Sequence, residues 1–210
     1  MRTLRAAPTG YVEFGRLDLD EHTKRRLIGL SVGWSVVSLV GVCAVASGLR
    51  TIEIVITPEQ LESFQVWGFL AGALAATVGA AVGTILAHEA VHGALLWWLT
   101  GDRPTFGFKG WYAYAAAPGW YFARDWFLLV ALAPAVVVTA VSLALFAVLP
   151  LVPALVMLVV AYTNLLGSIG DLYISWLVIR LPRSTIIEDR PEGVAWHRPG
   201  PDHSPAAGHN

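Results

Sequence analysis

The chain has 210 residues, of which 56% are hydrophobic and 14% are charged, and its mean hydropathy is +0.60. This composition is too apolar for an ordinary soluble domain and indicates a multi-pass membrane protein. The net charge of −1 argues against a nucleic-acid-binding protein. The single cysteine, Cys43, lies in an apolar stretch, so neither a disulfide framework nor a thiolate metal site is expected.

Four long apolar stretches follow a polar, basic lead at residues 1–26. Each exceeds the ~20 residues that cross a bilayer core, so each is a candidate transmembrane helix. The stretches are Leu27–Gly48, Trp67–Leu99, Phe127–Leu149 and Leu151–Ile179. The second is longer than one crossing requires, and we expect it to tilt, to protrude or to contain a break. Pro150 and Pro153 leave almost no loop between the last two, which predicts an antiparallel pair.

The segments around these stretches define the predicted domain organisation. A cleaved signal peptide is a competing interpretation of the first stretch, but its apolar run of about 20 residues is longer than the roughly 7–15 of a signal peptide. Residues 51–66 are expected to form a short outer helix that begins near Thr57 and Pro58. The four-helix domain covers residues 27–183. Residues 184–210 are rich in Pro, Gly and His, which predicts a partly disordered tail.

The basic residues orient the chain in the membrane. Thirteen of the 14 Lys and Arg residues lie in the N-terminal lead, between the second and third stretches, or after the fourth. Only Arg50 lies on the opposite side. By the positive-inside rule, both termini and residues 100–126 are predicted to be cytoplasmic in a multi-pass protein of the cell membrane.

The second apolar stretch contains a His-Glu-x-x-His motif, His88-Glu89-Ala90-Val91-His92. On a helix this spacing places two imidazoles on one face, where they can bind one zinc ion, and the Glu between them can act as general base on the zinc-bound water. Ionisable side chains are costly in hydrocarbon and rarely accidental there. The motif therefore predicts one zinc ion per chain. The alternative is that these side chains only line a polar contact between helices.

A hydrolytic zinc site needs a third protein ligand. Asp171 is the only acidic residue besides Glu89 within the four stretches, and every other histidine lies outside them. At 1.5 Å per residue, His88, His92 and Asp171 all lie about 12–18 Å from the cytoplasmic ends of their helices. Asp171 is thus predicted to complete the site between the second and fourth helices. A carboxylate that is only hydrogen-bonded within the bundle is the alternative.

Two further groups of residues are candidates for the site. Asn164, Ser168 and Asp171 share one helix face, so Asn164 and Ser168 could support the metal ligand or stabilise an oxyanion, or simply join membrane helices by hydrogen bonds. Aromatic residues alternate between residues 106 and 114, and a turn at residues 117–119 predicts a hairpin. Its edge could hold an extended substrate peptide, with Phe108, Tyr112 and Tyr114 in contact, or the aromatics could form a belt at the membrane interface.

These motifs resemble a known family of small multi-pass prokaryotic membrane proteins, the putative zincin peptidases, which are distantly similar to site-2 proteases. The likeness extends over roughly residues 65–190. It includes the segments 88–93, 132–134, 167–171, 181–182 and 188–189. The resemblance implies a zinc-dependent intramembrane peptidase with His88, His92 and Asp171 as ligands and Glu89 as the base. Site-2 proteases carry an Asn-Pro-Asp-Gly type of motif at the third ligand, whereas Asp171 lies between Gly170 and Leu172, which leaves the role of Asn164 and the substrate class open.

We therefore expect an all-α membrane protein with four transmembrane helices, a zinc site between helices 2 and 4, and a cytoplasmic β-hairpin. The predicted function is that of a zinc metalloendopeptidase that cleaves membrane-embedded or membrane-adjacent peptide segments. Its expected partners are that substrate and the lipid bilayer, and not nucleic acid. The alternatives are a non-hydrolytic metal-binding protein, such as a transporter or regulator, and an inactive scaffold.

Overall fold

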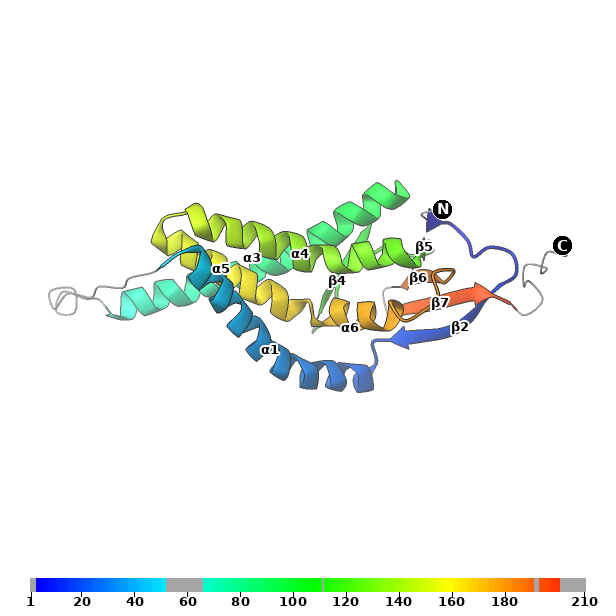
Figure 1. Ribbon diagram of the computed structural model, residues 1–210, viewed down its shortest axis with the longest axis horizontal. Coiled ribbons are helices and arrows are strands. Elements are labelled where there is room, and N and C mark those ends of the chain that lie inside the picture. The colour runs from blue at the N-terminus through cyan, green and yellow to red at the C-terminus, as the bar shows by residue number, and fades with distance from the viewer. Residues whose placement is uncertain (1–2, 52–65, 111, 191–192, 201–210) are drawn as a thin grey trace.

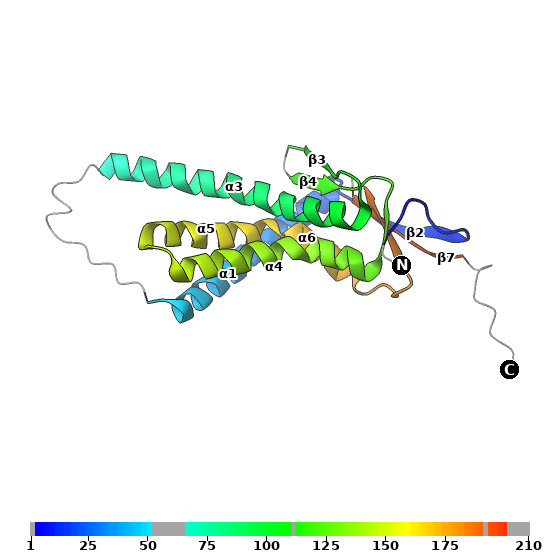
Figure 2. The same cartoon turned by 90° about the horizontal axis from the view of Figure 1, so that it is seen from above.

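A computed structural model describes residues 3–51, 66–110, 112–190 and 193–200 (Figure 1). Its helices form an elongated bundle, and a β-sheet covers one end of that bundle (Figures 1 and 2). The described helices are α1 (Glu21–Leu49), α3 (Val66–Thr100), α4 (Arg124–Val148), α5 (Leu151–Gly167) and α6 (Ile169–Val178). The predicted outer helix near Thr57 lies outside the described residues.

Among the described residues, three helices are long and apolar enough to cross a membrane: α1, the part of α3 from Leu70 onward, and α4. Helices α5 and α6 form a fourth span if they are taken together, although a bend of 43° separates them. Large apolar side chains on α1, α3 and α4 point outward, including Val32, Leu74 and Val136, each about two-thirds exposed. Such a surface suits contact with lipid.

The break between α5 and α6 differs from the continuous fourth helix expected over Leu151–Ile179. The backbone N–H and the hydroxyl of Ser168 both donate to the carbonyl of Asn164, at 3.0 and 2.7 Å. The indole N–H of Trp34, on α1, donates to the carbonyl of Leu165 at 2.6 Å. Side chains thus satisfy backbone groups at the break, as a bent helix in a membrane requires. The second helix, α3, is continuous over 35 residues, so the break considered there is not present.

The expectation of an all-α protein is corrected by a five-stranded antiparallel sheet with the order β1-β5-β6-β7-β2. Its strands are β1 (Thr3–Leu4), β2 (Tyr11–Asp18), β5 (Tyr121–Ala123), β6 (Ile186–Arg190) and β7 (Gly193–Pro199). The N-terminal lead and the tail that was expected to be partly disordered therefore both supply strands. The strand β2 is hard to recognise in the sequence, because Gly15 lies in its middle, at an irregular point of the pairing. This glycine packs under the ring of Trp196 from β7.

A second sheet consists of the hairpin β3 (Thr105–Phe108) and β4 (Ala113–Ala116). A hairpin is present in this region, but the predicted turn at residues 117–119 is wrong. The two strands are joined after Phe108 instead, where Lys109 N–H donates to the Tyr112 carbonyl and Gly110 has a φ of 82°. Residues 117–119 instead lead from β4 into β5 of the large sheet. A core that includes Leu96, Phe122 and Ile187 lies where the five-stranded sheet meets α3 and α4.

Candidate metal centre

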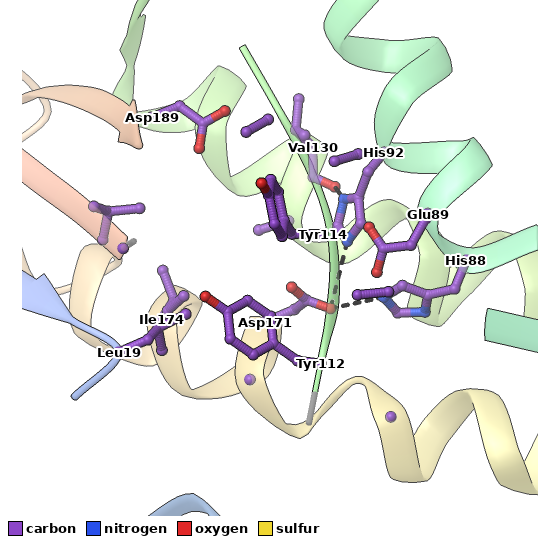
Figure 3. A pocket seen from close by; sticks show the side chains of 18 of the residues that line it. Leu19, His88, Glu89, His92, Tyr112, Tyr114, Val130, Asp171, Ile174 and Asp189 are labelled. Atoms are coloured by element: carbon purple, nitrogen blue, oxygen red, sulfur yellow. Dashed lines mark hydrogen bonds and ion pairs between the residues drawn. The ribbon is translucent and has the colours of Figure 1, made fainter. Parts of the chain in front are cut away.

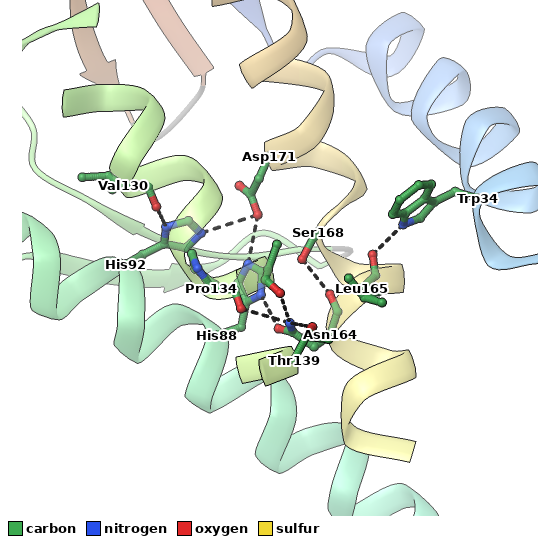
Figure 4. A network of polar contacts seen from close by, with 11 residues as sticks. Trp34, His88, His92, Val130, Pro134, Thr139, Asn164, Leu165, Ser168 and Asp171 are labelled. Carbon is green, nitrogen blue, oxygen red and sulfur yellow. Dashed lines mark hydrogen bonds and ion pairs between the residues drawn. The ribbon is translucent and has the colours of Figure 1, made fainter. Parts of the chain in front are cut away.

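Three side chains from two helices meet at one point in the bundle. His88 and His92 lie one turn apart on α3, and Asp171 lies in the first turn of α6. Oδ2 of Asp171 lies 3.0 Å from Nε2 of His88 and 3.5 Å from Nε2 of His92 (Figure 4). Both histidines are buried, and Asp171 is partly buried. The break before α6 turns Asp171 toward α3, so the predicted set of three does come together.

The second ring nitrogen of each histidine faces an oxygen acceptor. Nδ1 of His92 lies 3.0 Å from the carbonyl oxygen of Val130 on α4. This carbonyl is available because the residue four positions later is Pro134, which has no N–H to donate back to it. Nδ1 of His88 lies 2.9 Å from Oδ1 of Asn164 (Figure 4).

The orientation of Asn164 is fixed by its own contacts. Its Nδ2 donates to the Pro134 carbonyl at 3.0 Å and to Oγ1 of Thr139 at 2.9 Å, which leaves Oδ1 for His88. Asn164 therefore contacts a candidate ligand, as one of its predicted roles requires, and its bonds to α4 also join two helices, as the alternative requires. Its amide hydrogens already have acceptors, so the geometry does not favour the other role, donation to an oxyanion.

These contacts determine which nitrogen of each histidine is free. When Nδ1–H donates to an acceptor, a neutral imidazole has its lone pair on Nε2. Both Nε2 lone pairs then face a carboxylate oxygen of Asp171, which is favourable only if protons or a cation lie between them. Ligands about 2.0–2.2 Å from a tetrahedral zinc ion lie roughly 3.3–3.6 Å from one another. The 3.0 and 3.5 Å separations are close to this range, so the donor set fits zinc.

Glu89 lies beside the three candidate ligands without joining them. One of its contacts is a hydrogen bond from the backbone N–H of Ala115 in β4. Within the described part of the chain, its buried Oε2 has no hydrogen-bond partner. A carboxylate oxygen that is buried and unpaired is costly, and it is available to accept a proton from a water molecule.

A cavity of about 390 Å³ opens in front of these residues (Figure 3). Strand β4 runs past it, and its wall also includes residues of α1, α4, α5, α6 and of β5, β6 and β7. Tyr112 and Tyr114 line the cavity, as their predicted role in substrate binding requires. Phe108 is not among the lining residues and is 70% exposed. Ser168 is buried and its hydroxyl donates to the Asn164 carbonyl, so its bond supports the helix break.

Three contributors were missed by the sequence analysis. The Val130 carbonyl is a backbone group, and its only signal is the proline four residues later within an apolar stretch. The Ala115 N–H reaches Glu89 from a strand that is 26 positions away in the sequence. Asp189 lines the same cavity from β6, a strand that was not predicted.

A second group of possible ligands lies on the large sheet, where Glu13, Glu188 and His197 are close together. The guanidinium of Arg190 contacts both glutamates, and His197 Nε2 lies 3.1 Å from Glu188. Burial raises the pKa of Glu188, but the hydrogen bonds from Arg190 and His197 outweigh this effect and hold the pKa below its usual range. A cation already occupies this group, so we interpret it as an ion-pair network of the sheet.

The fold and the site define a class: membrane-type proteins with an inward-facing His-Glu-x-x-His helix and a carboxylate from another helix. Comparison with family models then identifies the family. Residues 81–186 match the model described as putative zincin peptidase, and the chain belongs to this family. The matched segment contains all three candidate ligands and Glu89. No curated protein and no solved structure shows significant similarity to the chain.

Proposed function

We propose that the protein is a zinc-dependent metallopeptidase that acts on peptide segments at or within the membrane. The observation that carries this proposal is the arrangement of four side chains. Nε2 of His88, Nε2 of His92 and Oδ2 of Asp171 converge on one point, and Oε2 of Glu89 is unpaired beside them. The family membership supports the same reaction class. The likeness to site-2 proteases stays a prediction.

Each residue has a defined task in this proposal. His88, His92 and Asp171 hold the metal, while Asn164 and the Val130 carbonyl keep both imidazoles in the tautomer with a free Nε2. A zinc ion held by these ligands would lower the pKa of a water molecule toward ~7 and polarise the scissile carbonyl. Oε2 of Glu89 would accept a proton from the attacking water and deliver it to the leaving amine, as the oxygen of that water bonds to the carbonyl carbon and the C–N bond breaks.

The cavity indicates how a substrate would lie. A peptide extended beside β4 would pass Tyr112 and Tyr114 and reach Glu89. The N–H of Ala115 already donates to Glu89, so we propose that the peptide lies beside this edge of β4 without pairing with it at Ala115. Because the wall includes both apolar helices and residues of the large sheet, we propose a segment at the membrane surface or just inside it. Phe108 is proposed only as an outer contact.

A metal analysis combined with a cleavage assay tests the function. We expect about one zinc per purified chain. Glu89→Gln should keep the zinc and lower peptide cleavage at least about 100-fold, since general base catalysis contributes roughly 10²–10⁴-fold. Asp171→Ala should lose most of the zinc. Glu21→Gln, an exposed glutamate at the start of α1, is the matched control and should change neither quantity.

The two variants separate the proposal from its alternatives. Undiminished cleavage by Glu89→Gln would rule out the assigned base. If the parent protein binds zinc but cleaves none of a panel of membrane peptides, a transporter or regulator would be favoured. Full zinc occupancy in Asp171→Ala would mean that the third ligand lies elsewhere.

A further inference from the structure

Strand β4 is attached to two carboxylates on the edge that faces the cavity. The N–H of Ala115 donates to Glu89, and the N–H of Ala117, just beyond the strand, donates to Oδ2 of Asp189 at 2.7 Å. Residues two apart in an extended segment present their N–H groups on the same edge. One edge therefore contacts both the proposed base and Asp189.

Asp189 holds both ends of the turn that follows β4. Its carboxylate accepts from Ala117, and its own N–H donates to the carbonyl of Trp120 at 3.3 Å. Within the turn, Trp120 N–H donates to the Ala117 carbonyl at 3.1 Å. Asp189 itself lies in β6, which pairs with β5 on one side and β7 on the other, so its backbone is well fixed.

The other strand of the hairpin, β3, is held by a contact with α3. The ring of Phe106 in β3 packs directly against Gly93, which follows the second histidine on α3. This contact places β3 on the helix but does not reach the end of β4. The end of β4 is held instead by the hydrogen bond from Ala117 N–H to the Asp189 carboxylate. In Figure 3, β4 crosses the view between Asp189 on one side and His92, Glu89 and His88 on the other.

We propose that Asp189 is a positioning residue that holds β4 where the Ala115 N–H meets Glu89, and so couples the large sheet to the catalytic base. The inference rests on the proposed function for the role of Glu89, but the coupling itself is a property of the fold. Without this anchor, the end of β4 moves away from α3. Glu89 then loses the backbone donor at Ala115, and the orientation of its unpaired oxygen is no longer fixed.

Hydrogen–deuterium exchange of the full-length protein in nanodiscs tests the coupling without any substrate. In Asp189→Ala, the amides of Ala115 and Ala117 should both exchange about fivefold faster or more. Ala117 loses its hydrogen bond to Asp189, and Ala115 is no longer held in place to donate to Glu89. Asp189→Asn should restore slow exchange, since the amide oxygen can accept from Ala117. Asp125→Ala removes an exposed carboxylate at the start of α4 and is the matched control, with no change expected.

Cleavage and metal content provide the second measurement. Asp189→Ala should lower kcat about 10–100-fold, the order expected from a misplaced catalytic group, with zinc content unchanged. Asp189→Asn should recover most of this loss. If Asp189→Ala does not fold, Ala117→Pro removes the same hydrogen bond from the other partner, and the same faster exchange at Ala115 is expected.

Two results would overturn the inference. If Ala117 exchanges faster in Asp189→Ala while Ala115 does not, the anchor exists but is not coupled to Glu89. If Asp189→Ala loses zinc, Asp189 acts on the ligands and not on the base. These outcomes are distinguishable from failure of the proposed function, which would appear as cleavage that is insensitive to Glu89→Gln while the exchange result stands.

Discussion

At the scale of single residues, the site depends on a backbone group that a proline makes available. In a regular helix the Val130 carbonyl would accept the N–H of residue 134. Pro134 has no N–H, so the carbonyl is left to accept from Nδ1 of His92. A residue that normally weakens a helix thus helps to orient a candidate metal ligand on the neighbouring helix.

Replacing this proline should separate metal binding from stability. In Pro134→Ala the new N–H competes with His92 for the Val130 carbonyl, so the affinity for zinc should fall about 10–100-fold. The α4 helix should become more stable, because proline inside a helix costs about 3 kcal/mol. Zinc affinity measured by chelator competition, and the Tm of the metal-free protein, check the two effects.

The matched control is Pro153→Ala, which changes a proline in the first turn of α5, where the missing N–H costs little. An unchanged zinc affinity in Pro134→Ala, with the expected gain in Tm, would show that the Val130 contact does not tune the site. A lower Tm would show that the proline fits its helix better than a regular hydrogen bond does.

Residues whose chemistry is local in sequence could be predicted, and residues that act through the backbone could not. The spacing of His88 and His92 is set by one helical turn, and Asp171 followed from being the one remaining carboxylate at matching depth. Asn164 was a candidate because it shares a helix face with Asp171. By contrast, the roles of Val130 and Ala115 lie in a carbonyl and an N–H, which every residue has, so their positions can be found only from the fold.

At the scale of elements, the apolar helices could be predicted from length and composition, whereas the large sheet could not. A transmembrane helix satisfies its backbone within one segment, so its signal is continuous. The five-stranded sheet assembles strands of two to eight residues from three distant parts of the chain. Its stability comes from those pairings, and short segments such as Tyr121–Ala123 carry no signal of their own.

Strand β6 shows how this sheet changes the chemistry of neighbouring carboxyl groups. Glu188 contacts Arg190 and His197, and its pKa is held below the usual range despite burial. Burial raises the pKa of the adjacent Asp189 to about 6, because its hydrogen bond from Ala117 only partly offsets the loss of water. The two side chains point to opposite sides of the strand and therefore meet different surroundings.

The raised pKa of Asp189 predicts a pH dependence of stability. The folded state holds this proton more tightly than the unfolded state, so the contribution of Asp189 is most favourable below pH 3.8 and is lost as the pH rises through about 6. The loss amounts to at most about 3 kcal/mol. The Asp189→Asn variant has no carboxyl group to ionise at this position. Without metal, it should therefore be more stable than the parent at pH 7.5, and this difference in stability should shrink at pH 4.

Thermal unfolding followed by tryptophan fluorescence between pH 4 and pH 8 measures this difference. Asp125→Asn changes an exposed carboxylate and should leave the pH profile as it is. A parent protein that gains stability relative to Asp189→Asn as the pH rises from 4 to 7 would contradict the predicted sign.

At the scale of the whole molecule, the sheet places three segments of the chain at one end of the bundle. The lead supplies β1 and β2, the loop between α3 and α4 supplies β5, and the C-terminal segment supplies β6 and β7. These segments, together with Arg124 at the start of α4, carry thirteen of the 14 basic residues. The pairing requires all three to lie on the same side of a membrane, which agrees with the grouping of the basic residues, while the choice of side rests on the positive-inside rule.

Cysteine labelling of intact cells tests which side this is. In a Cys43→Ser background, a membrane-impermeant maleimide should label Thr51→Cys, an exposed residue after α1, without permeabilisation. Lys109→Cys, in the turn of the hairpin, should react only after the membrane is opened, because the basic side of the protein faces the cytoplasm. Labelling of Lys109→Cys but not of Thr51→Cys from outside would invert the orientation and place the cavity and its substrate on the outer side. Reaction of both positions from outside would contradict the requirement that α3 crosses the membrane, and with it the membrane assignment of the metal centre.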